Sequence, residues 1–175
     1  HEAASYYAQA LSRDPSNNEL TESTVLSFLS LGEVEKALPL ARVLEERSQK
    51  SQVARLVLTA GMAQAEDFAG LLAQKPDPSG IGPWVDGLVK AWSHLGAGDL
   101  AASMNAFDAL SKEAGMQGFV MYHKALALAS IGDFEGAEAI FGSAGAGAAG
   151  QTRRGVIAHT QVLAKLGRHD EGLTV

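Results

Sequence analysis

The sequence contains no cysteine, so neither a disulfide nor a thiolate metal site can form within the chain. The absence of cysteine is compatible with a reducing and with an oxidising compartment. No run of apolar residues approaches the roughly 20 that a membrane-spanning helix needs, so we expect no membrane insertion. The chain begins with His1-Glu2 rather than with Met, and we therefore expect a fragment or a processed form, from which a targeting segment could have been removed.

Positive charge is also scarce. The chain has 14 Lys and Arg against 20 Asp and Glu, which gives a net charge of −6, and its cations are scattered. Modules that bind nucleic acid usually present a basic face. We therefore expect no nucleic-acid partner and no attraction to anionic membrane surfaces.

Proline is sparse, with 5 residues, and a two-residue alternation of apolar and polar residues is nearly absent. Ala, Leu, Glu and Gly dominate instead, and Ala and Leu are strong helix formers. Apolar residues recur at helical spacing along most of the chain, and their share of 46% is ample for a continuous core. The composition therefore predicts an all-α fold.

One short phrase recurs along the chain. It consists of an apolar residue, Gly, an acidic or polar residue, and a small residue four or five positions after the Gly. A period near 34 residues is typical of a helix–turn–helix repeat. The copies are Leu31–Ala37, Ala97–Ser103, Ile131–Ala137, Leu166–Gly172 and a degenerate Ala65–Leu71, and their turn residues Gly32, Glu66, Gly98, Gly132 and Gly167 are spaced 34, 32, 34 and 35 apart.

Each part of the phrase has a physical reason. The apolar residue ends an amphipathic helix, and Gly follows because the end of a helix often needs a left-handed residue. Asp or Glu comes next, near the start of the second helix, where negative charge is favourable. The small residue, such as Ala37 or Ala137, lets the second helix pack closely on the first, so we expect both alanines to be buried.

These features resemble the tetratricopeptide repeat family, which has Leu-Gly before the turn, then a small residue, an aromatic residue and Ala, with Pro between repeats. Phe107 occupies the aromatic position of its copy. Two other segments match most fully: Ala3, Tyr7, Ala10 and Asp14-Pro15, and Ala137, Phe141 and Ala144. The resemblance implies a right-handed α-α superhelix, or solenoid, of about five antiparallel helix–turn–helix repeats. Residues 1–175 would form one repeat domain, truncated at both ends through a repeat.

The copies depart from the family pattern at three places. Pro39 lies in the first turns of its helix, Glu66 stands where the other copies have Gly, and Gly96-Ala97 look like two extra turn residues. With these departures, we expect eleven helical segments, bounded to within a few residues. They cover roughly 2–13, 19–31, 33–48, 51–62, 64–74, 82–95, 99–114, 117–131, 133–143, 152–166 and a stub from 168, with loops at 14–17, 75–80 and 142–150.

The run Gly145–Gly150 matches the Gly-x-Gly-x-x-Gly pattern of dinucleotide sites, and Asp170 lies at about the right distance for a ribose contact. That site also requires a preceding strand and a βαβ unit, and here the run follows a helix. We therefore interpret it as a flexible loop of small residues and expect no nucleotide cofactor. No histidine pair has zinc spacing, and no Gly-x-Ser-x-Gly elbow is present, so we expect neither a metal nor a catalytic site.

Three further features leave alternatives open. His169-Asp170-Glu171 is interpreted as favourable charge at a helix start, with a metal site as the alternative. Arg153-Arg154 is interpreted as capping and solubilising a helix, with partner contact or an ion pair as the alternative, because the helix dipole disfavours cations there. Trp84 and Trp92 share one helix face and belong either to the core or to an exposed partner anchor.

In the family that this chain resembles, the first helix of each pair lines a groove that binds extended or helical peptides. Transferring those positions gives a mixed apolar and charged lining, which suits a protein segment rather than a polyanion. No Lys–Asn arrangement for clamping a terminal carboxylate is well placed. The groove residues are Glu22, Leu26 and Ser30, then Asp86, Lys90 and His94, then Phe119, Tyr122 and Leu126, and finally Arg154, Ile157 and Gln161.

The sequence therefore predicts a non-catalytic scaffold that binds another protein or peptide in its groove. Two alternatives stay open: a structural or self-assembling module, in which homo-oligomers form through exposed terminal helices, and an accessory helical domain of a larger enzyme. The many Ala and Gly residues and the eroded repeats resemble bacterial repeat proteins, several of which are exported. That analogy slightly favours the periplasm or cell envelope over the cytoplasm.

Overall fold

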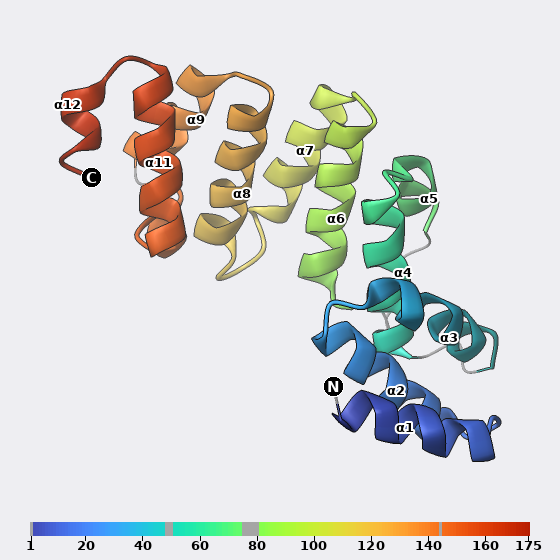
Figure 1. Cartoon of the computed structure of the whole chain (residues 1–175). Coiled ribbons are helices and arrows are strands. Elements are labelled where there is room, and N and C mark those ends of the chain that lie inside the picture. Colours follow the sequence, from blue (N-terminus) through green and yellow to red (C-terminus); the bar gives the residue numbers. More distant parts are fainter. Residues whose placement is uncertain (1, 48–50, 75–80, 144) are drawn as a thin grey trace. The chain divides into compact units, whose positions relative to one another are not determined.

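The computed structural model describes residues 2–47, 51–74, 81–143 and 145–175. Every regular element in these ranges is a helix, as Figure 1 shows, so the predicted all-α class is confirmed. The predicted loop at residues 75–80 lies outside the described residues. The chain divides into two compact units, His1–Asp86 and Gly87–Val175, and each is described by itself.

Unit 1 is a stack of antiparallel helices in which each helix packs on the next along the chain. Helices α2 and α4, which are separated in sequence by α3, also contact each other. This is the packing of consecutive hairpins in a helical repeat. The helices are α1 (Glu2–Arg13), α2 (Asn18–Ser30), α3 (Val34–Arg47), α4 (Gln52–Gln64) and α5 (Phe68–Ala73), and α6 (Pro83–Gly96) begins in this unit and continues into the next.

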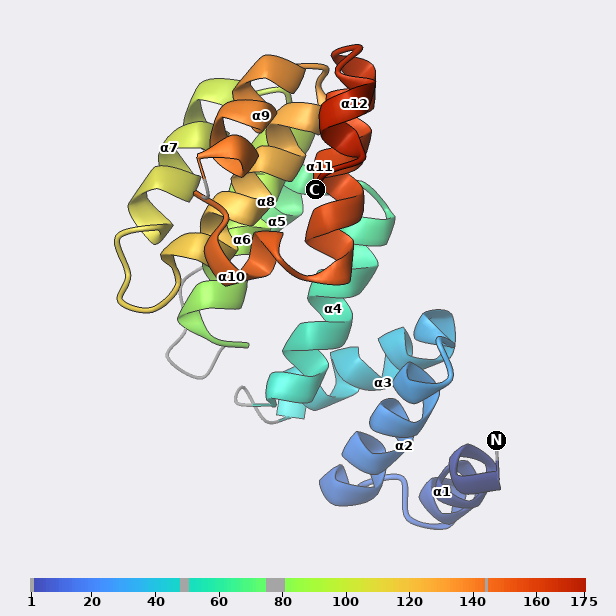
Figure 2. The same ribbon diagram turned by 90° about the vertical axis from the view of Figure 1, so that its left-hand side faces the viewer.

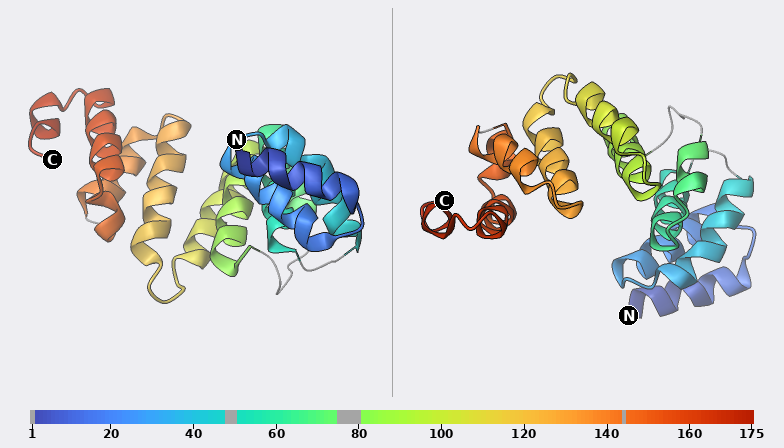
Figure 3. Two further views of the ribbon diagram at one scale, coloured as in Figure 1. Left: turned by 60° about the horizontal axis from the view of Figure 1, so that its bottom comes forward. Right: turned by 90° about the horizontal axis from the view of Figure 1, so that it is seen from above.

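Unit 2 repeats the arrangement with one addition, the short helix α10 between two hairpins. Helix α10 packs against α8 and against α11, and the turned view in Figure 2 shows it beside both. The pair α11 and α12 is seen nearly along its axes in the right panel of Figure 3. The helices after α6 are α7 (Leu100–Leu110), α8 (Gln117–Ser130), α9 (Phe134–Gly142), α10 (Gly147–Gly150), α11 (Arg153–Lys165) and α12 (His169–Gly172).

The turn within every hairpin has the same conformation. The residues Gly32, Glu66, Gly98, Gly132 and Gly167 all have positive φ, between 54° and 88°. In each turn, the N–H that follows the left-handed residue donates to the carbonyl five residues earlier, as Asp133 N does to Leu128 O at 3.0 Å. This bond caps the carbonyl end of the helix. Glu66 therefore adopts the glycine conformation without being glycine.

The acidic residue after the turn begins the second helix. The side chains of Asp67, Asp99 and Asp133 accept hydrogen bonds, all 2.9 Å long, from the backbone N–H three residues later. A carboxylate in this position satisfies an otherwise unpaired donor and interacts favourably with the helix dipole. In these hairpins, the left-handed residue therefore ends the first helix, and the acidic residue directly after it caps the start of the second helix.

The predicted turn insertion at Gly96-Ala97 is wrong. Helix α6 runs to Gly96. Ala97 is the C-cap residue, whose N–H donates to Ser93 O, and the left-handed Gly98 follows it. Ala97 thus corresponds to Leu31 of the first hairpin, and the copy contains no extra residue. Glycine in the last helical turn was mistaken for the turn itself.

Small residues fill the contacts between the helices of a hairpin. Ala37 and Ala137 are both fully buried, as predicted. Around Ala37, the core of unit 1 is aliphatic, with Val25, Leu44 and Val57 as its larger members. The cores of unit 2 contain Phe107, Phe141 and Val162, with several partly buried rings packed against them.

Candidate functional site

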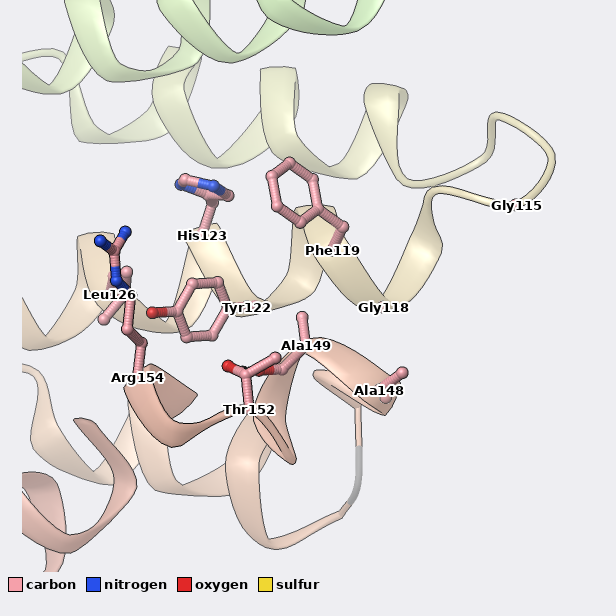
Figure 4. Close-up of a pocket in the computed structure, with 11 residues that line it drawn as sticks. Gly115, Gly118, Phe119, Tyr122, His123, Leu126, Ala148, Ala149, Thr152 and Arg154 are labelled. Atoms are coloured by element: carbon pink, nitrogen blue, oxygen red, sulfur yellow. Dashed lines mark hydrogen bonds between the residues drawn. The ribbon is translucent and has the colours of Figure 1, made fainter. Parts of the chain in front are cut away.

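A cavity of about 800 Å³ lies in unit 2 between α8, α10 and the start of α11 (Figure 4). Cavities of this size accommodate small ligands or the side chains of a bound segment. Its lining combines one aromatic helix face with a wall of small residues. The lining residues are Gly115, Gly118, Phe119, Tyr122, His123, Leu126, Gly147, Ala148, Ala149, Thr152 and Arg154.

Helix α10 forms the wall of this cavity, and glycines allow it to approach α8 closely. A Cβ atom added to Gly118 would lie 3.1 Å from Ala146 O and 3.2 Å from the Cα atom of Gly147. A Cβ on Gly147 would lie 3.3 Å from the Cα of Gly118. The two backbones therefore cross where neither residue has a side chain. Part of the predicted loop at residues 145–150 is a helix, because Gly147–Gly150 form α10, and its small residues serve helix packing.

Three rings of α8 form the floor. Phe119 and His123 are one helical turn apart, with ring centroids 4.8 Å apart in an edge-to-face arrangement. Tyr122 makes similar contacts with His123, at 5.5 Å, and with Phe141 of the core, at 6.2 Å. Phe119 remains 42% exposed, whereas Tyr122 is half-buried and packs against the core. The floor is thus continuous with the core, and Phe119 is its accessible part.

His123 is held as a neutral imidazole. The indole Nε1–H of Trp92, on α6, points at its Nδ1 atom from 3.4 Å, so that nitrogen serves as an acceptor. Burial among the rings lowers the pKa of His123 below its ordinary value of 6.5, because a charged ring would lose its hydration there. His123 therefore contributes a polar edge without a charge at neutral pH.

Arg154 supplies the charge. It is exposed, and among the residues that the structure describes it makes no ion pair. The described lining of the cavity contains no Asp or Glu. Thr152, which caps α11 through its hydroxyl and the N–H of Gly155 at 3.1 Å, fixes the helix turn that carries Arg154. The cavity therefore has an apolar floor with one cation at its edge.

Four of the predicted groove residues, Phe119, Tyr122, Leu126 and Arg154, line this cavity. Gln161 and Ile157 are exposed on α11 outside its lining. In unit 1, Leu26 is exposed on α2.

Glu22, also on α2, accepts a hydrogen bond of 2.8 Å from the hydroxyl of Ser51, the residue that caps α4. The carboxylate of Glu22 thus links two neighbouring first helices. Ser30 is exposed at the end of α2.

The residues predicted on α6 need a corrected register. Asp86, Lys90 and His94 lie on α6, and the expected Gly96-Ala97 insertion after them is absent from the structure. Counted back from the left-handed Gly98, the positions that correspond to Tyr122 and Leu126 of α8 are Leu88 and Trp92. The two tryptophans of α6, which the sequence assigned either to the core or to an exposed anchor, differ in the structure. Trp84 is exposed, whereas Trp92 packs edge-to-face on Phe107 with ring centroids 6.0 Å apart.

We call the helix that precedes each turn the first helix of its hairpin. Exposed large apolar side chains lie mainly on these first helices. Every first helix carries at least one, at six, ten, thirteen or fourteen residues before the left-handed residue, spacings that fall on one helix face. Among the described second helices, only α1 and α7 carry one, Tyr6 and Leu100. The first-helix set is Leu26, Leu56, Trp84, Val85, Phe119 and Ile157.

A separate polar cluster joins α9, α11 and α12. Glu138 lies 2.7 Å from His159 Nε2 and 3.3 Å from Arg168 Nη1. Arg168 also forms a bidentate pair with Glu171, which raises the pKa of Arg168 and lowers that of Glu171. Glu171 of the predicted His169-Asp170-Glu171 cluster is thus occupied by an ion pair.

Within the described residues, no group of three His, Asp or Glu side chains is arranged to hold a metal ion. The helices found in those ranges also include none with the length and apolar character needed to cross a membrane.

A sequence model described as "Tetratricopeptide repeat" matches residues 1–51 and 88–151 of this chain. The second range includes most of the cavity, from α8 through α10. No curated protein shows a significant match to the chain.

Proposed function

The chain belongs to the tetratricopeptide repeat family, and from this premise we propose that it is a non-catalytic module that binds a segment of another protein on the first helices of its hairpins. Repeats of this family generally mediate protein–protein interactions. Within unit 2, the proposed contact surface includes the cavity beside α8.

The observation that carries the proposal is the uneven distribution of exposed apolar side chains. Such residues recur at equivalent positions of the first helices, whereas most of the described second helices carry none. Exposed apolar surface of this kind commonly marks an interaction site. Phe119 adds an aromatic ring, and aromatic residues often contribute much of the binding energy at an interface.

The cavity supports the same proposal. Its floor of Phe119, Tyr122 and His123, together with Leu126, offers apolar area, and its wall of small residues leaves that area open. The imidazole of His123 and the guanidinium of Arg154 add polar groups that can orient a segment. A mixed lining of this kind suits a peptide with apolar anchors better than nucleic acid, which requires several cations.

The test uses two exposed apolar residues of similar accessibility. Phe119, on first helix α8, is 42% exposed, and Leu100, at the start of second helix α7, is 41% exposed. A peptide is selected from a random displayed library with the whole chain as bait, and its affinity is measured by calorimetry. Phe119→Ala should weaken binding at least about tenfold, as expected for an aromatic anchor, whereas Leu100→Ala should leave it unchanged.

Failure to select any peptide, or an equal loss for both variants, would contradict the proposal. Tyr122→Ala is less informative because Tyr122 packs on Phe141, so the substitution also removes core contacts. Self-assembly is distinguished by light scattering: if the chain's mass rises with concentration and Phe119→Ala prevents the rise, the occupant of this surface is another copy of the chain.

A further inference from the structure

We infer that the cavity between α8 and α10 selects an internal segment that carries an aromatic side chain beside an acidic one. This inference rests on the proposed function and names the chemistry of the partner. It is carried by two properties of the cavity, which are the order of its polar and apolar ends and the sign of its charge.

The cavity has two different ends. Figure 4 shows Phe119 at the end of the cavity toward Gly118 and Gly115, whereas the hydroxyl of Tyr122 points toward the other side, where Arg154 lies. The charged group, Arg154, therefore lies at the end of the cavity away from Phe119. A side chain that fills the Phe119 end places its neighbours near Arg154.

The apolar end favours an aromatic occupant. Phe119, Tyr122 and His123 already meet one another edge-to-face, and another ring can add to this arrangement in the same geometry. The wall opposite consists of backbone, Ala and Gly atoms, against which a flat ring packs without steric conflict. An aliphatic side chain would bury area but would lack the ring–ring contacts.

The polar end favours a carboxylate. Arg154 is the one formally charged residue in the described lining, and no acidic residue lies there, although the chain as a whole carries a net charge of −6. Its guanidinium makes no ion pair within the described residues, so its donors are available to a planar acceptor. Burial lowers the pKa of His123, which disfavours a second positive charge beside Arg154.

The acidic group belongs to a side chain within the segment rather than to a chain end. Holding a terminal carboxylate requires several convergent donors, and here one exposed arginine is present. A single guanidinium at an exposed edge suits an Asp or Glu side chain that stays partly hydrated. Arg153 is the matched residue next to it: it is also exposed on the first turn of α11, but it does not line the cavity.

The experiment uses the whole chain labelled with ¹⁵N and three end-blocked hexapeptides of glycine and serine. The first contains one tryptophan followed by aspartate, the second has asparagine for aspartate, and the third has alanine for tryptophan. The first peptide should shift the amide signals of Gly118, Gly147 and Thr152 and bind at least threefold more tightly than the second. The third should bind at least tenfold more weakly.

The charge assignment is tested by Arg154→Gln and Arg153→Gln. Arg154→Gln should make the aspartate and asparagine peptides bind equally, and Arg153→Gln should preserve their difference. Both side chains are exposed, so both variants should fold, which the dispersion of the amide spectrum checks. Added salt should weaken the binding of the aspartate peptide more than the binding of the asparagine peptide.

The inference is overturned if the two peptides bind the unaltered chain equally, or if the shifted signals lie away from the cavity. It is also overturned if peptides selected from the random library bind the first helices with no preference for acidic residues. That result would leave the proposed function standing. Failure to obtain any binding peptide from the library would overturn the proposed function itself.

Discussion

The two units use the same turns but differ in the chemistry that follows from them. In unit 1, α3 ends at Arg47 and α4 begins at Gln52, and the neighbouring first helices α2 and α4 are linked through Glu22 and Ser51. In unit 2, α9 and α11 are separated by a longer connection, and α10 within it packs against α8. In unit 2, a walled cavity therefore lies beside the contact between the first helices α8 and α11.

The cores differ as well. The core of unit 1 is aliphatic, around Val25, Leu44 and Val57. In unit 2, edge-to-face contacts connect Phe107 to Trp92, Trp92 to His123, and His123 to Phe119 at the cavity. The comparison shows that the repeat fixes the turns and the small residues between helices, whereas the remaining positions are free to become either plain core or a recognition surface.

The largest expected effect tests what the two units share. Ala37→Leu and Ala137→Leu should each lower the free energy of unfolding by about 1–3 kcal/mol, because both alanines are fully buried and a larger side chain overpacks the contact. Ala139→Leu, at an exposed position of α9, is the control and should have little effect. Urea unfolding measures all three. A large loss in one unit only would show that the small-residue position is not equivalent in both.

A smaller effect is expected at the turns. Gly132→Ala should destabilise the chain by about 1–2 kcal/mol, because an added Cβ has free space there and only the left-handed backbone opposes it. Glu66→Gly in unit 1 should stabilise it by up to about 1 kcal/mol, since Glu66 already has φ of 54°.

Glu66→Ala is the control for the turn experiment. It removes the carboxylate but keeps a Cβ at the left-handed position, so its unfolding midpoint should stay near that of the unaltered chain. If Glu66→Gly fails to stabilise while Gly132→Ala destabilises, the turns of the two units are not energetically equivalent.

The smallest expected effect is a pH dependence of stability that arises from His123 in unit 2. Because burial lowers the pKa of His123 below 6.5, the unfolded chain binds this proton more readily than the folded chain does. The free energy of unfolding is therefore unaffected by this proton above about pH 6.5. It decreases as the pH falls from there through the lower pKa of the folded state.

His123→Gln should therefore reduce the loss of stability on acidification between about pH 7 and 5, followed by tryptophan fluorescence during urea unfolding. Glutamine keeps an acceptor for the indole N–H of Trp92. His169→Gln, at an exposed position, is the control. Equal pH slopes for His123→Gln and the unaltered chain would exclude this contribution.

Much of the fold could be predicted because its signals are local. The turn residues and the acidic caps at Asp99 and Asp133 were evident from the repeated phrase, and most helix limits follow from it within two residues. The register of α6 was misplaced because Gly96 and Gly98 are both candidates for a helix end, and composition does not distinguish them. Glu66 departs from the repeated phrase, yet it has the same left-handed conformation as the glycines, and Asp67 N donates to Met62 O as in the other turns.

The candidate site could be predicted only in part. Phe119 and Tyr122 follow from their helical positions, but the cavity depends on where α10 lies, which is a long-range contact. Sequence reasoning missed His123 and Thr152 as lining residues. The run of Ala and Gly at residues 145–150 was an available signal, because small residues permit close backbone packing as well as flexibility.

The shared turns also bear on how the chain folds. Each is closed by a hydrogen bond that spans only five residues, as between Arg168 N and Leu163 O, so very little chain entropy is lost in forming it. Arrays of this kind can nucleate at any hairpin and grow outward. The five similar turns in the described residues are thus five places at which folding can begin.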